Sequence, residues 1–334
     1  MIITMQRIQY IDRLKGFAML AVIFGHIYFF SLNDGNNLLV RFVSTFHMPL
    51  FMFLSGWVIS SVPDIKKVFI KSVSFLSPFL FVGLSFVIFN HKDVAGFFEG
   101  SAKNGYWYLF VLSLFYVFLW SSRLISRFVK FKWAEVIWAV TIWAFLIMIQ
   151  FTLSERWSNV LSVYQARTLW PLFIAGYLFR KYNLTETVLS RNIVFSCCMI
   201  AYAVTVYFFT KGFSRLFLFS AFLSVLTFVY LFKKFESNSG VVSNALAKIG
   251  RHSLDIYIFH FFFVFALRLS GWHEYFMVTD NLLLECVIVA ILSVAIAYSC
   301  IGIGYLIRQS EFIEKLIYGK YITNAIISFN KKSA

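Results

Sequence analysis

The segment IDRLKGFAMLAVIFGHIYFF, residues 11–30, decides the fold of this chain. About twenty mostly apolar residues are enough to cross a bilayer as one helix. Asp12 and Lys15 lie near its start, and His26 lies deep in its apolar part. At about 100° per residue, Lys15, Asp12 and His26 share one stripe of the helix, with Lys15 and His26 roughly 16 Å apart along the axis. Ionisable groups in a membrane segment indicate a functional site.

The remainder of the 334-residue chain has the same apolar character. Hydrophobic residues make up 60% of it and charged residues 13%, and the mean hydropathy is +0.78. A soluble domain is nearer half apolar and a quarter charged. We therefore predict an all-α membrane protein, a bundle of about ten transmembrane helices. The expected spans are 14–32, 38–61, 68–90, 106–122, 133–152, 168–179, 192–210, 214–232, 253–270 and 282–307.

The distribution of basic residues predicts the orientation of these spans. With the N-terminus inside, the inner segments hold 22 of the 30 lysines and arginines, which places both termini in the cytoplasm. This bias explains the net charge of +15 without a nucleic-acid partner, and some of these cations are expected to contact membrane lipid headgroups. We expect a single domain over residues 1–334, with 310–334 as a cytoplasmic tail lying on the inner membrane surface.

Four further segments contain candidate functional residues. In FHMPLFMFLSG, residues 46–56, His47 enters the second span, and Pro49 favours a kink with close packing at Ser55 and Gly56. The basic segment after Asp64 contains Lys67 and Lys71, which either follow the positive-inside bias or bind phosphate.

Of the other two segments, one lies on the expected outer side and one enters the ninth span. In GYWYLFVL, residues 105–112, Trp107 fits an aromatic belt or stacks on a sugar ring, and the outer cation Arg167 could hold an anionic substrate group. The span of residues 168–179 contains Pro171 and is expected to be tilted or broken. In GRHSLDIYIFH, residues 250–260, a structural role for His260 is favoured. No metal, P-loop, dinucleotide or hydrolase motif occurs, so soluble enzyme classes have no support.

Five segments together resemble the bacterial integral-membrane acyltransferase family 3, in particular its sugar O-acetyltransferase branch. They are RIQYIDRLKGFAMLAVIFGH, FHMPLFMFLSG, KKVFIKSVSFLSPFL, NGYWYLFVL and GRHSLDIYIFH, in this order along the chain. The sequence departs from the family pattern at Lys15, Lys67 and Lys71, where arginine is common. Lysine keeps the charge but loses the bidentate geometry of arginine.

The resemblance implies an O-acetyltransferase of the bacterial cytoplasmic (inner) membrane. It would move an acetyl group from cytoplasmic acetyl-CoA to a hydroxyl of a glycan of the capsule, exopolysaccharide or O-antigen type. His26 would be the general base or, as the less favoured alternative, carry the acetyl group itself. His47 would assist near His26 or hold the acceptor, and Asp12 would orient or balance Lys15. The donor-binding cations would be Lys15, Lys67 and Lys71, and the glycan-binding residues would be Trp107 and Arg167; no metal is expected.

Two other functions stay open from the sequence. Intramembrane histidines also suit a transporter or flippase for a lipid-linked sugar, with His26 and His47 as a proton relay, although no internal inverted repeat is visible. A scaffold within a polysaccharide-export complex is the third possibility. It predicts that replacing either Lys15 or His26 leaves function unchanged.

Overall fold

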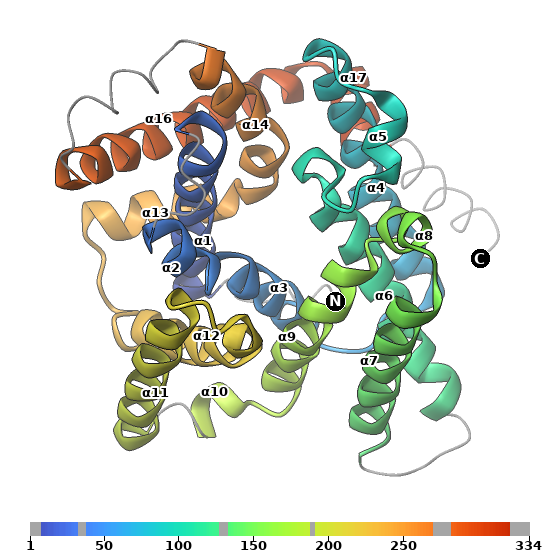
Figure 1. Cartoon of the computed structure of the whole chain (residues 1–334), viewed down its shortest axis with the longest axis vertical. Coiled ribbons are helices and arrows are strands. Elements are labelled where there is room, and N and C mark those ends of the chain that lie inside the picture. The colour runs from blue at the N-terminus through green and yellow to red at the C-terminus, as the bar shows by residue number, and fades with distance from the viewer. Residues whose placement is uncertain (1–7, 33–37, 127–132, 188–190, 270–281, 321–334) are drawn as a thin grey trace, which may run out of the picture. The chain divides into compact units, whose positions relative to one another are not determined.

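The structure is a computed structural model that describes residues 8–32, 38–126, 133–187, 191–269 and 282–320. Within these ranges every regular element is a helix (Figure 1). Eight of the described helical segments are long and apolar enough to cross a membrane: Gln9–Ser31, Leu38–Trp57, Ile65–Phe89, Trp107–Ile125, Ala134–Thr152, Asn192–Thr210, Ser214–Lys234 and Leu282–Gln309. The chain is therefore an all-α multi-pass membrane protein. The expected span at 168–179 is also helical, and so is the expected span at 253–270 as far as residue 269. The total of ten spans and the cytoplasmic termini stay predictions.

The chain forms two compact units. The first contains Met1–Ser55 and Leu178–Ile303, and the second contains Gly56–Tyr177 and Gly304–Ala334. The expectation of a single domain stays a prediction. Three helices continue from one unit into the other, namely α3 (His47–Trp57), α9 (Val163–Lys181) and α16 (Leu282–Gln309).

The first unit is organised around its N-terminal helix. Here α1 packs against α12, α13 and α14, and α11 lies beside α12 (Figure 1). Besides α3 and most of α16, its helices are α1 (Gln9–His26), η1 (Ile27–Ser31), α2 (Leu38–Ser44), α10 (Leu184–Thr187), α11 (Asn192–Thr210), η3 (Ser214–Leu216), α12 (Phe217–Lys234), α13 (Val241–Arg251) and α14 (Ser253–Leu269).

The second unit packs α4 against α6 and α6 against α7. Its helices, besides most of α9, are α4 (Ile65–Phe89), α5 (Val94–Glu99), η2 (Lys103–Gly105), α6 (Trp107–Ser126), α7 (Ala134–Thr152), α8 (Glu155–Val160) and α17 (Glu311–Ile317). At the end of α3, a Cβ on Gly56 would lie 1.8 Å from the Phe173 carbonyl oxygen of α9. This confirms the expected close packing at Gly56.

The second expected span is interrupted between residues 44 and 47, whereas the sequence predicts a kink at Pro49. Instead α2 ends at Ser44, and α3 begins at His47 with Pro49 in its first turn, where a missing backbone N–H costs little. Pro49 cannot donate to the Thr45 carbonyl, four residues back. The Ser224 hydroxyl of α12 lies 3.2 Å from this oxygen and 2.7 Å from the Ala221 carbonyl oxygen, so its one proton is shared between the two acceptors.

The sequence predicts that the sixth span is tilted or broken. The break is wrong, and the tilt stays a prediction. α9 is an unbroken helix of 19 residues with Pro171 inside it. Pro171 leaves the Arg167 carbonyl without its usual donor, and the indole Nε1 of Trp143 donates to that oxygen over 3.0 Å. Satisfaction of the free carbonyl by a neighbouring helix explains why α9 continues through proline.

The expected tail, 310–334, is described only as far as residue 320. Ser310 caps α17, accepting a hydrogen bond from the Ile313 backbone amide. Lys315 pairs with Glu311 one turn earlier, which supports this short helix. The placement of the tail on a membrane surface stays a prediction, and residues 321–334 lie outside the described residues.

Candidate active site

The beginning of α1 is fixed against α13 by two glycines. A Cβ on Gly16 would lie 2.0 Å from the Leu246 carbonyl oxygen, and a Cβ on Gly250 would lie 1.8 Å from the Asp12 carbonyl oxygen. Neither approach is possible with a side chain present, so the two backbones touch directly. The glycines of the first and fifth sequence motifs are therefore partners in one helix crossing.

Asp12 and Lys15 lie at this crossing. Asp12 is 7% exposed and lies in the first turn of α1, where a carboxylate interacts favourably with the helix dipole. Lys15 is partly exposed. The expected balancing of Lys15 by Asp12, and the contact of Lys15 with a donor, stay predictions.

His26 lies at the other end of α1, where the helix changes to the π-helix η1. Such π segments are often found at functional sites, because the wider turn moves side chains off the regular helical face. The His26 ring lies 4.8 Å from the Phe261 ring and 5.5 Å from the Phe30 ring, measured between centroids. Aromatic rings thus surround an imidazole that can accept a proton.

His260 of α14 meets His26 at this place, with 5.3 Å between ring centroids. Its Nδ1 lies 3.1 Å from the Ile256 carbonyl oxygen and 2.8 Å from that of Tyr257. Because carbonyl oxygens only accept, Nδ1 carries the proton and Nε2 is the acceptor nitrogen. Nε2 is buried without a hydrogen-bond partner within the described residues. The site therefore contains an oriented acceptor beside His26.

His47 is the third histidine of this region. It is partly exposed at the start of α3, and its Nδ1 lies 2.8 Å from the Val43 carbonyl oxygen. His26 interacts electrostatically with both His260 and His47, and the interaction with His260 is the larger. The sequence named His26 and His47 together, and this interaction places both in one neighbourhood.

The second unit contains the expected phosphate-binding lysines. Asp64 caps α4, accepting a hydrogen bond from the Lys67 backbone amide over 2.7 Å. Lys67 is exposed in the first turn, and Lys71 follows one turn later on the same face. The two like charges interact. Two ammonium groups at the positive end of a helix make a local field that attracts anions.

Trp107 and Arg167 also belong to the second unit. Trp107 is partly exposed as the first residue of α6, whereas the preceding Tyr106 is fully buried. The Arg167 guanidinium stands over the Tyr164 ring, 5.7 Å from its centroid. Both side chains are accessible, and their contact with a glycan stays a prediction.

A family model described as an acyltransferase domain, that of acyltransferase family 3, matches residues 8–302. The chain belongs to this family. No curated protein and no solved structure matches it. The match runs through α1 and α14, so both histidines that meet in the first unit lie within the acyltransferase domain.

The sequence did not predict the surroundings of two residues. It favoured a structural role for His260, which stays a prediction, without placing it beside His26, and it gave no role to Arg13, which is 4% exposed. The available signal for His260 was a second histidine in an apolar span; for Arg13 it was a cation within the first motif. No group of three or more His, Cys, Asp or Glu side chains suited to a metal ion occurs in the part of the chain that the structure describes.

Proposed function

We propose that this membrane acyltransferase moves an acetyl group from acetyl-CoA to a hydroxyl of a glycan, with His26 as general base. The observation that carries the proposal is the meeting of His26 with His260 at the π turn of α1. A proton acceptor on a membrane-spanning helix, in a chain of this family, suits acyl transfer to a hydroxyl.

In the proposed step the glycan hydroxyl attacks the thioester carbonyl carbon while an imidazole nitrogen of His26 takes the hydroxyl proton. The new C–O bond forms, the C–S bond breaks, and the CoA thiolate leaves and receives a proton. His260 orients His26 through ring contact, and its unpartnered Nε2 can share the transferred proton. His47 assists by holding the acceptor or by electrostatic interaction with His26.

Donor binding is assigned to cations. We propose that Lys67 and Lys71 bind CoA phosphates at the start of α4, because lysine is a good point charge for phosphate. Lys15 is the donor-binding candidate of the first unit, and Asp12 would orient it. Each lysine is tested by itself, through the apparent KM for acetyl-CoA.

Acceptor binding is assigned to Trp107 and Arg167. A partly exposed indole offers an apolar face to a sugar ring, and a partly exposed guanidinium offers hydrogen bonds to an anionic sugar. The acceptor class is a glycan of the capsule, exopolysaccharide or O-antigen type, modified at a bacterial inner membrane.

The deciding experiment has two arms. Purified protein in lipid nanodiscs is given acetyl-labelled acetyl-CoA and a glycan extract, and label transfer is measured. In parallel, NMR spectra of cell-surface glycans are compared with and without the gene. Label transfer together with loss of one O-acetyl signal supports the proposal. Sugar movement across the membrane without thioester consumption would favour the transporter and overturn it.

A further inference from the structure

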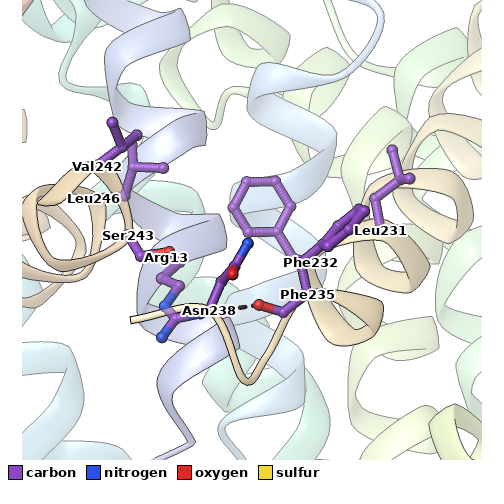
Figure 2. A pocket seen from close by; sticks show the side chains of 8 residues that line it. All are labelled: Arg13, Leu231, Phe232, Phe235, Asn238, Val242, Ser243 and Leu246. Carbon is purple, nitrogen blue, oxygen red and sulfur yellow. Dashed lines mark hydrogen bonds between the residues drawn. The ribbon is translucent and has the colours of Figure 1, made fainter. Parts of the chain in front are cut away.

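A pocket lies beside the first turns of α1 (Figure 2), and His26 is not among its lining residues. Its volume is about 390 Å³, within the range of ligand-binding pockets. Most of the wall is apolar and comes from the end of α12, the following loop and the start of α13, through Leu231, Phe232, Phe235, Val242 and Leu246. The charged residue of the wall is Arg13.

The guanidinium of Arg13 donates hydrogen bonds to backbone and amide oxygens. Nη1 donates to the carbonyl oxygens of Phe235 and Glu236 over 3.1 and 3.0 Å, and Nη2 donates to the Gln9 side-chain oxygen over 3.0 Å. All three acceptors are neutral oxygens. The Nε atom is buried without a hydrogen-bond partner in the described residues. A buried cation held by neutral groups, with one donor left over, is suited to an anion.

The position of the pocket indicates where such an anion comes from. Arg13 lies near the end of a membrane-spanning helix, where headgroups of the bilayer are found. The adjoining α13 has a pronounced apolar face, yet its first residues Val241 and Val242 are 87% and 72% exposed. Exposed apolar side chains on an amphipathic helix are typical of a segment that lies in the membrane interface.

We propose that this pocket binds one anionic phospholipid, with its phosphate at Arg13 and the first part of an acyl chain against Phe232 and Leu246. Free CoA fits less well, because it carries several phosphates and the pocket wall contains one guanidinium among apolar side chains. The bound lipid links α1 to the loop after α12 and to α13, and this site is independent of the proposed acyl-transfer chemistry.

The test uses full-length protein in a neutral detergent and native mass spectrometry. Phosphatidylglycerol, phosphatidylcholine and free CoA are each titrated. We expect phosphatidylglycerol to bind about tenfold more tightly than phosphatidylcholine. Both lipids carry the phosphate, but the choline ammonium of phosphatidylcholine lies beside it and is repelled by the Arg13 guanidinium. Equal binding of the two lipids, or displacement of phosphatidylglycerol by CoA, overturns the proposal.

Three variants locate the site. Arg13→Gln and Ser243→Phe should each reduce phosphatidylglycerol binding to the level of phosphatidylcholine, the second by filling the pocket while leaving the hydrogen bonds of Arg13 intact. Lys181→Gln, which removes an exposed cation of the same unit, should bind as the wild type does. Wild-type binding by Ser243→Phe overturns the proposal even if Arg13→Gln fails to fold.

Discussion

At the Gly16 end of α1 the backbone of α13 lies so close that no Cβ fits, whereas at the His26 end the helix widens and meets aromatic side chains. One sequence motif of fifteen residues, from Asp12 to His26, therefore serves two purposes. Its glycine fixes the position of α1, and its histidine faces the imidazole of α14. The comparison teaches that residues of one motif can be needed for different reasons, which separate variants can distinguish.

Replacing His26 should have the largest effect on function. Without the general base, we expect His26→Ala to reduce acetyl transfer by about 10²–10⁴-fold. The rate is measured in nanodiscs with labelled acetyl-CoA. Phe29→Ala, which truncates an exposed side chain of η1, is the matched control and should keep its rate. A wild-type rate in His26→Ala, at equal folded protein, would show that this end of α1 has no chemical role.

The glycine crossing should control stability rather than chemistry. Gly16→Ala and Gly250→Ala each push a Cβ into a backbone carbonyl and should reduce the free energy of unfolding by about 1–3 kcal/mol or more. Gly25→Ala, whose Cβ would lie 3.6 Å from Val43 Cγ1, and Gly240→Ala, with no atom within 4 Å, are the matched controls. Thermal unfolding in detergent measures all four. Equal melting temperatures would refute the tight crossing.

Composition and spacing were sufficient for the all-helical membrane fold, because a long apolar run in lipid must be helical. They did not reveal that Gly16 meets Gly250, since nothing in either motif says which helix packs on which. The unbroken α9 was missed for the same reason: the donor that compensates Pro171 is Trp143 on another helix. Helix pairing also decides that His260 faces His26, so the sequence could name each histidine but not their contact.

His260 offers a finer test of the histidine end. We expect His260→Asn to keep a donor near the Ile256 and Tyr257 carbonyls but to lose the acceptor Nε2. Loss of about one hydrogen bond in the transition state should lower kcat about tenfold, with KM for acetyl-CoA unchanged and the pH–rate profile altered. A merely structural role predicts lower folded yield with an unaltered pH profile, so the profile is the deciding measurement.

The buried Arg13 of the first unit has a counterpart in the second unit, the buried Lys103. The smallest effect that we expect is the contribution of Lys103 to the pH dependence of stability. Lys103 is 2% exposed, and its Nζ donates to the Phe98 carbonyl over 2.9 Å and to those of Gly100 and Asn159 over 3.4 Å. Arginine stays charged at every accessible pH. Burial, however, lowers the pKa of Lys103 from 10.5 to about 8.

Between these two pH values the unfolded chain binds more protons at Lys103 than the folded chain does. The free energy of unfolding should therefore rise with pH from about 8 to 10.5, since protonation is favoured on unfolding in this window. The measurement compares the pH slope of the melting temperature in wild type and in Lys103→Met. The variant should lose the part of the slope due to Lys103, and an identical slope would contradict the lowered pKa. Arg13→Gln is the control variant and should leave this slope unchanged.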